Sequence, residues 1–527
     1  MNDFQQQVIA ILKEHAPIWL VGGVVRDQLL GMPSQDIDLV SPLQPEKAEE
    51  ILRKNNFEPL RLGKNFNTLT LFTENKRIDL VYAENLFQDA MGRDFTINAI
   101  YLEPNSGEIF DPFDGRKDLE DKVLKCCGTP EDRFREDPLR ILRMVKFAVK
   151  YQMKIEEKTW EEARKLLDLL ANVSKERITA ELAEILVLEE AEKAARLLAE
   201  VGYWDVFVPE LARLQGIVQN EYHSLDVWEH TMAVFRNTPP DLFLRLAALF
   251  HDIGKWETAS RECFLSGKLE YSENKYRIDK YVIIGTRGKG ELDSKLRPLI
   301  GKEIKILGAR LDEYPDIVQF KRLLLGEDLK KGISYVEKGK RHFLNHEKAS
   351  ARLLAEILQR YTFTMHFAGG GQKRQDDLLK LVENHMQATL TFMPEFRGGK
   401  AKNPFEERAA ELVWKLCWDG RIFEVQNIHD FVVLWRADFM AGKVHTEAQI
   451  KLFEEIQAEL INVALWQKET LSKFNWYLLQ DFAANQGLSG ASLGRFKNFV
   501  RAKAMRERQP EINLPFLKKA YVQFNKR

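Results

Sequence analysis

One short stretch near the N-terminus, residues 20–39, restricts the possible folds more than any other part of the chain. It reads LVGGVVRDQLLGMPSQDIDL: an apolar strand (18–21) runs into two glycines, and a short helix then carries Arg26. A second strand opens with Asp36 and Asp38, which strand alternation places on one face. Glycines before a helix let phosphate approach backbone N–H groups, and paired carboxylates suit Mg²⁺. The stretch predicts metal-assisted phosphoryl or nucleotidyl transfer; the alternative is a surface turn with two solvated acids.

Composition sets the broad class. The chain has 527 residues, 45% of them hydrophobic, which is enough for several cores. Its net charge of −1 gives no sign of a polyanionic partner, so any such surface must be local. The four cysteines have neither zinc spacing nor a disulfide framework. The N-terminus lacks the order of a signal peptide, and no apolar run reaches the ~18 residues of a membrane helix, so we expect a soluble, cytoplasmic protein with no membrane partner.

The residue pattern predicts an α+β head with a small mixed sheet, followed by a mainly α-helical remainder. In the head we expect a helix at 45–54 and strands at 68–72 and 77–82. Further helices are expected at 137–151, 158–170, 175–188 and 191–201. Residues 256–340 are punctuated by glycine and rich in strand formers, which predicts an inserted β-rich subdomain. The predicted domains are 1–118, 119–210, 211–445 with that insertion, and 446–527.

Two further motifs carry polar side chains at helical spacing. GRDFTINA (92–99) is expected to begin a helix with Arg93 and Asp94, followed one turn later by Asn98. REDPLRILR (135–143) is expected to begin another, with Asp137 as its N-cap.

In the second of these motifs, Asp137 and Arg140 lie three residues apart and would share one helix face. An acceptor beside a planar donor fork can hydrogen-bond the edge of a base. Arg143, one turn on, could hold a phosphate. The stripe of Arg140, Arg143, Lys146, Lys150 and Lys154 could equally be a solvated helix face.

Taken in order, LVGGVVRDQLLG…DIDL, RDFTINAIYL, DPFDGRKDLEDKVLK and EDPLRILRMVKFA resemble the class II tRNA nucleotidyltransferase and bacterial poly(A) polymerase superfamily, over roughly residues 15–210. The resemblance implies a nucleotidyltransferase head and a helical neck that binds nucleotide and RNA. The substrates would be CTP, ATP and the 3′ end and acceptor stem of tRNA, with Mg²⁺ at the catalytic Asp36 and Asp38. Asp137 with Arg140 would read the base. The implied nucleotide-binding residues are Gly23, Arg26, Arg93, Asp94, Asn98, Asp137, Arg140 and Arg143.

Two departures from the family pattern bear on where addition stops. Gly92 stands where the family usually has arginine. Only 13 residues, LVYAENLFQDAMG, separate Asp79 from Arg93. In the family that this chain resembles, members that add the terminal adenosine have a much longer flexible loop at this position. The comparison predicts efficient addition of two cytidines and poor or absent addition of adenosine.

A second site is predicted in the C-terminal half. His230 lies in WEHT, and His251-Asp252 ends the apolar run LAALFHDIGK. Such mixed nitrogen and oxygen donors suit a divalent metal. The pattern resembles the HD phosphohydrolase superfamily, which implies Asp438 as a further ligand, histidines His346 and His385 at a second metal, and a transition metal such as Ni²⁺, Mn²⁺ or Co²⁺. The alternative is that some of these are core histidines.

The C-terminal tail, 495–527, has ten lysines and arginines with aromatic residues between them. It could grip an RNA backbone, or it could be a helical cap whose aromatics are core. Three rival functions stay open: a poly(A) polymerase acting on general RNA, an HD phosphohydrolase with a nucleotide-binding head, and a non-catalytic RNA-binding protein. No obligatory protein partner is evident.

Overall fold

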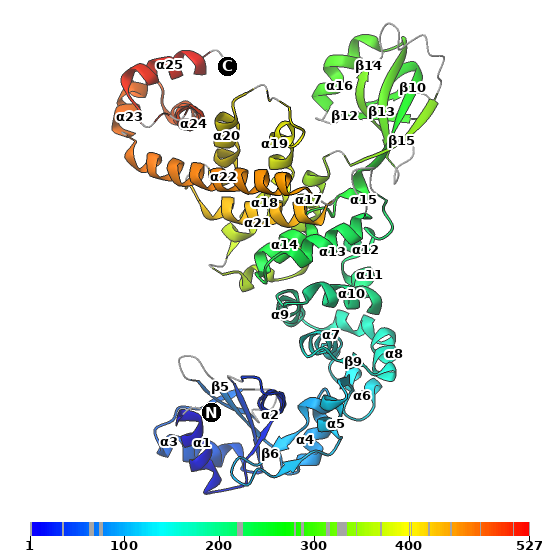
Figure 1. The fold of residues 1–527 in the computed structure, drawn as a ribbon, viewed down its shortest axis with the longest axis vertical. Helices are drawn as coiled ribbons and strands as arrows, with labels where there is room; N and C mark the ends of the chain where they lie inside the picture. The colour runs from blue at the N-terminus through cyan, green and yellow to red at the C-terminus, as the bar shows by residue number, and fades with distance from the viewer. Residues whose placement is uncertain are drawn as a thin grey trace. The chain divides into compact units, whose positions relative to one another are not determined.

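The computed structural model describes the chain apart from short segments, and it divides into two compact units, Met1–Val206 and Phe207–Arg527 (Figure 1). The segments outside the description are 1–2, 34–35, 63–67, 73–76, 219–224, 279–280, 286–288, 312–316, 324–334, 344, 369–370, 400, 402, 420–421, 443–444, 475, 508, 510 and 526–527. Each unit is described by itself.

The first unit contains a seven-stranded mixed sheet in the order β3-β4-β5-β2-β1-β6-β7. Its strands are β1 Trp19–Val21, β2 Ile37–Ser41, β3 Leu60–Leu62, β4 Thr68–Phe72, β5 Arg77–Tyr82, β6 Tyr101–Leu102 and β7 Ile109–Phe110. Central strand β2 runs antiparallel to β1 and parallel to β5. Apolar side chains such as Leu20, Leu39 and Leu80 alternate into the core, which fixes the register and leaves the intervening polar residues on the other face.

Helices make up the rest of this unit, in agreement with the predicted fold class. They are α1 Asp3–Lys13, α2 Gly23–Leu29, α3 Pro45–Lys54, α4 Leu86–Gly92, α5 Gly115–Glu120, α6 Pro130–Glu136, α7 Arg140–Lys150, α8 Glu157–Lys165, α9 Lys175–Leu186 and α10 Ala191–Val201. A short parallel pair, β8 Val123–Leu124 and β9 Lys154–Ile155, and two 3₁₀ turns, η1 Thr96–Asn98 and η2 Leu167–Asn172, complete it. The predicted helix 45–54 and strands 68–72 and 77–82 are confirmed.

Two predicted helix starts are wrong. Asp137 does not cap α7; its backbone is extended between α6 and α7, and Leu139 occupies the N-cap position. The residue before a proline avoids the helical region, and Pro138 imposes this on Asp137. Arg93 and Asp94 do not begin a helix either: they follow the end of α4, and Asn98 lies in η1.

The second unit is mainly helical. Its helices include α12 Pro209–Ala212, α13 Val227–Asn237, α14 Leu242–Phe250, α15 Lys255–Thr258, α17 His346–Arg360, α18 Gln372–Asn384, α19 Gln387–Phe396, α20 Phe405–Cys417, α21 Gln426–Ala441, α22 Glu447–Lys473, α23 Trp476–Asn485, α24 Gly490–Arg506 and α25 Leu514–Phe524; α11 Tyr203–Phe207 crosses the division between units. Helix α13 packs on α14 and α21, and α17 packs on α18. No helix in the described part of the chain combines the length and apolar character that crossing a membrane requires.

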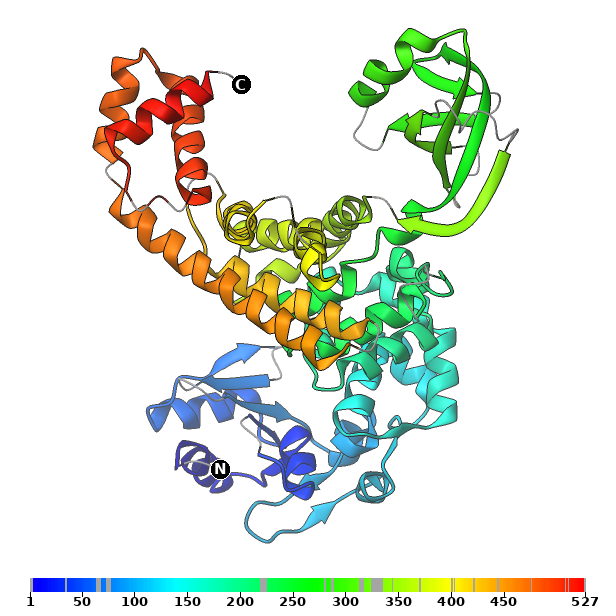
Figure 2. The same ribbon diagram turned by 45° about the horizontal axis from the view of Figure 1, so that its top comes forward.

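The β-rich segment forms a sheet of six strands between α15 and α17 (Figure 2). The strands are β10 Ala259–Ser272, β11 Lys275–Ile278, β12 Tyr281–Gly285, β13 Glu303–Leu311, β14 Ile317–Leu323 and β15 Tyr335–Phe343, with α16 Lys289–Leu296. It has a core of its own that includes Leu269, Ile283 and Leu296. The sheet therefore begins and ends about three residues later than the predicted 256–340.

The aromatic residues of the tail belong to a hydrophobic core. Phe496 is fully buried and Phe516 is 7% exposed, while Phe499, Tyr521 and Phe524 pack against the same cluster. Of the two predicted readings of the tail, these contacts favour the helical cap over a row of exposed stacking rings.

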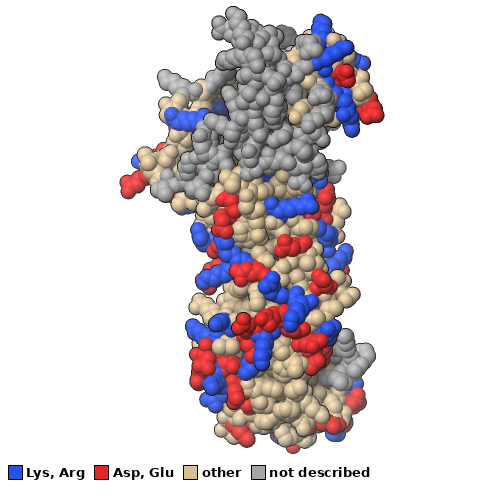
Figure 3. Space-filling model, turned by 90° about the vertical axis from the view of Figure 1, so that its right-hand side faces the viewer, with Lys and Arg blue, Asp and Glu red and all other residues tan. Residues whose placement is uncertain are grey.

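On the face drawn in Figure 3, basic and acidic side chains are interspersed, as the net charge of −1 leads one to expect.

Candidate active site and metal centre

Three carboxylates gather at the centre of the first unit's sheet. Because β2 and β5 are parallel and in register, Asp38 lies directly beside Asp79. Asp36 stands exposed one residue before β2, not inside it as predicted, and its Oδ1 accepts a hydrogen bond from the Arg77 backbone N–H (3.1 Å). Thr70 Oγ1 donates to Asp79 Oδ1 (2.6 Å) and fixes that carboxylate. Sequence reasoning missed Asp79: alternation in RIDLVY separates the two faces of β5, but it does not show that β5 pairs with β2.

The electrostatics of Asp38 favour a bound cation. Burial raises the pKa of Asp38; the Arg93 guanidinium opposes this, and the neighbouring carboxylates Asp79 and Asp36 raise it further. Clustered acids repel one another unless positive charge lies between them, and carboxylate oxygens are the ligands that Mg²⁺ prefers. The residues present therefore fit a divalent metal.

Gly22, rather than Gly23, is the glycine that this site needs. Its φ is +74°, and a Cβ there would lie 3.0 Å from Asp38 Oδ2 and 3.2 Å from Arg93 Nη1. A Cβ on Gly23 would meet only Arg26 Nη2, at 3.4 Å. Gly22 thus lets the start of α2 lie against the Asp38 carboxylate.

A buried network connects α2, η1 and α7. Arg26, 5% exposed, donates to Asn98 Oδ1 and stacks 4.3 Å from the Tyr151 ring centre. Asn98 Nδ2 donates to Asp94 Oδ1 (2.9 Å), and Arg143 donates to Asp94 Oδ2 through Nε (2.8 Å) and Nη2 (2.6 Å). Burial would raise the pKa of Asp94, but Arg143 and Asn98 more than offset it and the pKa falls. The network fixes the direction of Arg143.

An open cleft of about 560 Å³ lies between β5, α4, α7 and α9. It brings together five of the predicted nucleotide-binding residues: Arg93, Asp94, Asp137, Arg140 and Arg143. The other three, Gly23, Arg26 and Asn98, are not among the residues that line it. Arg177 of α9 also lines the cleft and was not among the predicted site residues.

Asp137 and Arg140 are each held by other residues. Asp137 Oδ2 accepts from Arg177 Nη2 (2.8 Å). Arg140 donates through Nη1 to Glu136 Oε2 (2.7 Å) and through Nη2 to the Gly92 carbonyl (2.7 Å). Both side chains face the cleft, so together they can present a donor and an acceptor to a base.

The predicted basic stripe is largely neutralised. Lys146 is buried and paired with Glu181 and Glu184, and Arg143 is paired with Asp94. Only Lys150 and Lys154 of the stripe are exposed. Lys146 therefore links α7 to α9, and little of the positive charge of the stripe is left to bind a ligand.

In the second unit, all six predicted metal-binding residues come together. Their donor atoms form two groups, one of His230, His251 and Asp438, and one of Asp252, His346 and His385. Asp252 connects them: its Oδ2 lies 3.1 Å from His251 Nε2, and its Oδ1 lies 3.1 Å from His346 Nε2. Helices α13, α17 and α21 carry His230, His346 and Asp438. The other three residues directly follow helices: His251 and Asp252 follow α14, and His385 follows α18.

The imidazoles are oriented as metal-binding histidines usually are. The Nδ1 atoms of His251, His346 and His385 lie 2.7–2.8 Å from the carbonyl oxygens of Ala248, Phe343 and Val382. Donation from Nδ1 leaves Nε2 free to bind a metal. The Nε2 of His251 and both oxygens of Asp252 are buried and make no hydrogen bond of normal geometry, although they lie close to one another and to His346 and Lys255; such a set of donors fits a metal between them.

Lys255 was overlooked in the sequence. It is 6% exposed, and its Nζ lies 2.6 Å from Asp252 Oδ2. The spacing HD-x-x-K on a turn into α15 was the available signal. A buried ammonium beside the bridging carboxylate can bind an anionic group at the same site.

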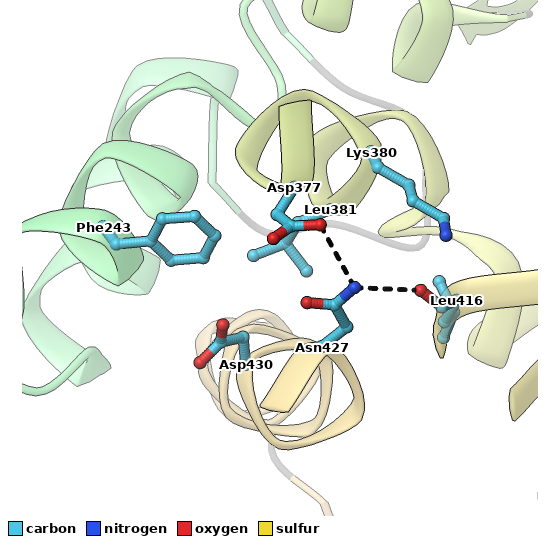
Figure 4. Close-up of a pocket in the computed structure, with 7 residues that line it drawn as sticks. All are labelled: Phe243, Asp377, Lys380, Leu381, Leu416, Asn427 and Asp430. Atoms are coloured by element: carbon cyan, nitrogen blue, oxygen red, sulfur yellow. Dashed lines mark hydrogen bonds between the residues drawn. The ribbon is translucent and has the colours of Figure 1, made fainter. Parts of the chain in front are cut away.

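A separate small cavity of about 10 Å³ in this unit contains none of the predicted residues (Figure 4). Asn427 Nδ2 bridges it by donating to Asp377 Oδ1 (3.2 Å) and the Leu416 carbonyl (3.3 Å). Burial raises the pKa of Asp377 and lowers that of Lys380. We interpret it as a polar packing contact between α18, α20 and α21.

Comparisons with known proteins agree with this geometry. The poly A polymerase head domain matches residues 18–84 and 75–125, and the probable RNA and SrmB-binding site of polymerase A matches 152–214. The chain is 33% identical to an A-adding tRNA nucleotidyltransferase of Deinococcus radiodurans over 254 residues, which are 46% of this chain and 58% of that protein. It shares its fold with the Bacillus stearothermophilus CCA-adding enzyme in complex with CTP (TM-score 0.55, 17% identity, 100% of both chains) and with the Thermotoga maritima enzyme complexed with tRNA (TM-score 0.53, 18% identity, 99% of this chain and 96% of that one).

One relative is similar enough to decide the family. The CCA-adding enzyme of Lactococcus lactis subsp. cremoris (strain SK11) is 31% identical over 277 residues, which are 48% of this chain and 68% of that protein. The resemblance noted in the ordered motifs is confirmed: the chain belongs to the superfamily of class II CCA-adding enzymes and bacterial poly(A) polymerases.

Proposed function

We propose that this protein is a tRNA nucleotidyltransferase that adds CMP to tRNA 3′ ends without a template and releases pyrophosphate. The observation that carries the proposal is the cluster of Asp36, Asp38 and Asp79 beside Gly22, in the unit that also holds the arginine-lined cleft. Its relatives include enzymes named for CCA and for A addition to tRNA. The neck, matched as an RNA-binding site, would hold the tRNA, and the tail would do so only through its lysines and arginines, because its aromatic residues belong to a core.

In the reaction, the RNA 3′-hydroxyl oxygen bonds to the α-phosphorus of CTP while the bond from that phosphorus to the bridging oxygen breaks. Asp36, Asp38 and Asp79 would hold Mg²⁺, which when bound activates the hydroxyl and neutralises charge on the departing pyrophosphate. Arg93 lies beside Asp38, and Arg143, directed by Asp94, supplies a fixed donor for phosphate oxygens. Gly22 leaves room for the triphosphate to approach the backbone of α2.

We infer that Asp137 and Arg140 select cytosine and that addition stops after two cytidines. The stretch expected to be a shortened loop, 80–92, is the end of β5, a connection of three residues and α4. Arg140 is tied to the last residue of α4 through the Gly92 carbonyl, and Asp137 is tied to Arg177. Adenine presents a different edge and size, so accepting it requires both side chains to move, and these anchors oppose that movement.

The decisive experiment uses tRNA ending at the discriminator base, incubated with CTP, ATP or both, and sequences the product ends. We expect products ending in CC in both reactions that contain CTP. A majority ending in CCA would refute the stop after two cytidines but leave the transferase assignment intact. Efficient A addition to tRNA already ending in CC would do the same. Long A tails on general RNA would instead identify a poly(A) polymerase.

We propose a second activity in the other unit, metal-dependent hydrolysis of phosphoesters. It rests on the two adjacent groups of candidate ligands, which Asp252 connects, and on Lys255 beside Asp252. Two adjacent metals can stabilise both the attacking and the leaving oxygen of a phosphoester, and Ni²⁺, Mn²⁺ or Co²⁺ would suit these donors.

This activity is tested by metal analysis of the purified protein and by hydrolysis of bis-p-nitrophenyl phosphate and p-nitrophenyl phosphate with each metal. A protein with neither metal nor activity would refute the assignment. A protein that keeps its metal but hydrolyses neither substrate would also refute it.

A further inference from the structure

The inserted sheet closes on itself. Strand β10 pairs with β11 at one edge and with β13 at the other, so the first five strands form a ring in the order β10-β11-β12-β14-β13. Only the β12–β14 pairing is parallel. Helix α16 lies in the connection between β12 and β13. A five-stranded barrel of this topology, with a helix between its third and fourth strands, is an OB-fold, which commonly binds oligonucleotides or oligosaccharides on its second and third strands.

The inside of this barrel is packed with apolar side chains. Leu269 of β10, Ile278 of β11 and Ile283 of β12 are buried together with Leu292 and Leu296 of α16. Since side chains alternate along a strand, the intervening residues of β11 and β12 lie on the outer face.

That outer face carries cations beside apolar groups. Lys275 is exposed and Arg277 is half-buried on β11, and Arg277 lies directly opposite Val282 of β12. Val282 is in turn beside Ile317 of β14, and both are half-buried. Single-stranded nucleic acid sites combine cations for the phosphates with surface for the bases, which is most often aromatic; here the aliphatic Val282 and Ile317 would provide that surface.

The acids nearest to Arg277 leave it able to bind another anion. Glu270 of β10 lies across from it, and Glu273 Oε2 approaches Arg277 Nη2 only to 3.6 Å. Ion pairs at such exposed positions are weak, so a phosphate can replace them.

The charge of the insertion differs from that of the rest of the chain. Residues 259–343 contain 19 lysines and arginines against 13 acids, whereas the whole chain contains 78 against 79. This excess favours a polyanion over an uncharged oligosaccharide.

The barrel is attached at the metal centre of the second unit. Its two ends pair with each other at Ala259 and Phe343, and the Phe343 carbonyl lies 2.8 Å from Nδ1 of the proposed metal ligand His346. The other end follows α15, which carries Lys255. A polymer bound to the barrel would thus be tethered near that centre.

We propose that the inserted barrel is a binding module for single-stranded RNA, in which Lys275 and Arg277 contact phosphates and the apolar strip of Val282, Ile284 and Ile317 contacts bases. This site is separate from the nucleotide cleft and does not depend on the proposed nucleotidyl transfer. It gives the chain an RNA contact in addition to the one proposed for the head and neck.

The test measures binding of a fluorescein-labelled single-stranded RNA of about 12 nucleotides, a length suited to one such barrel, by fluorescence anisotropy with the full chain. We expect Lys275→Glu with Arg277→Glu to weaken binding about tenfold and to reduce the slope of log affinity against log salt by about 1.4, the contribution of two phosphates at ~0.7 each. The matched control, Lys295→Glu with Lys302→Glu, makes the same charge change at exposed positions on α16 and before β13, and we expect it to change affinity by less than about twofold.

A second variant keeps the test decisive if charge reversal unfolds the barrel. Because Ala259 and Phe343 are paired, residues 260–342 can be replaced by a short glycine-serine loop. We expect this variant to extend tRNA normally but to bind the single-stranded RNA about tenfold more weakly. The proposal is overturned if the deletion binds as tightly as the full chain, if the control weakens binding as much as the test variant, or if a duplex of the same sequence binds the barrel equally well.

Discussion

Replacing Gly22 with alanine tests whether the backbone at the start of α2 must lie against Asp38. The φ of +74° costs a residue with a side chain about 1–3 kcal/mol. The new Cβ would also lie 3.0 Å from Asp38 Oδ2 and 3.2 Å from Arg93 Nη1, so these groups must shift by a few tenths of an ångström. Since a misplacement of about 1 Å can lower a rate about 100-fold, we expect kcat/KM for CMP addition to fall by about 10-fold to 100-fold.

The assay is single-nucleotide extension of tRNA with CTP, run beside thermal unfolding. Gly31→Ala is the matched control, because Gly31 also has a positive φ (+68°) but nothing lies within 4 Å of its added Cβ. We expect both variants to lose a few degrees of stability, at roughly 2–4 °C per kcal/mol, and only Gly22→Ala to lose activity. Equal activity of the two variants would show that the close approach to Asp38 is not required.

Three further expectations concern individual residues. Asp38→Asn should reduce pyrophosphate release at least about 1000-fold with the fold intact, because the proposed role of this carboxylate is to hold the metal that stabilises the transition state; near-normal turnover would contradict the assignment. Arg140→Ala should raise misincorporation of UMP and GMP. Arg143→Lys, which keeps a cation beside Asp94, should raise the KM for CTP about tenfold and leave base selectivity unchanged. A loss of selectivity in Arg143→Lys with a raised KM in Arg140→Ala would exchange the roles of the two arginines. His251→Ala should remove the bound transition metal, whereas the control His429→Ala, on the same helix as Asp438, should retain it, and neither should affect tRNA extension. Equal metal content in the two variants would exclude His251 as a ligand.

The strands and helices of the head were predictable where apolar residues recur with a single periodicity, that of a strand or that of a helix. The strands 68–72 and 77–82 begin with alternating polar and apolar residues, and the helix 45–54 begins at a proline and ends with two basic residues. Errors occurred where backbone sterics or tertiary contacts decide. Pro138 forces Asp137 out of the helix, and Arg93 becomes extended after α4, contrary to the periodicity of their neighbours.

Which residues come together at each candidate site was easier to predict than the contacts that support them. Asp38 and His251 are recognisable because they belong to short motifs. Asp79, by contrast, joins the site only through the parallel register of β2 and β5, which no local pattern specifies. The same holds for Arg177, which reaches Asp137 from a helix 40 residues later.

The proposed metal centre of the second unit shows how two motifs of candidate ligands can tolerate a barrel between them. His251 and His346 lie on either side of the insertion in the sequence, yet the segments that carry them are in direct contact. The Gly254 backbone N–H donates to Ser350 Oγ (2.9 Å). The two backbones are so close that a Cβ on Gly254 would lie 2.6 Å from both the His346 carbonyl oxygen and the Ser350 nitrogen. This contact between the turn before α15 and the first turns of α17 involves no residue of the barrel. The pairing of Ala259 with Phe343 then closes the insertion at its base, so its two ends remain adjacent. The position of His346 is therefore set by helix packing, and the barrel can carry a different binding surface without altering the spacing of the ligands.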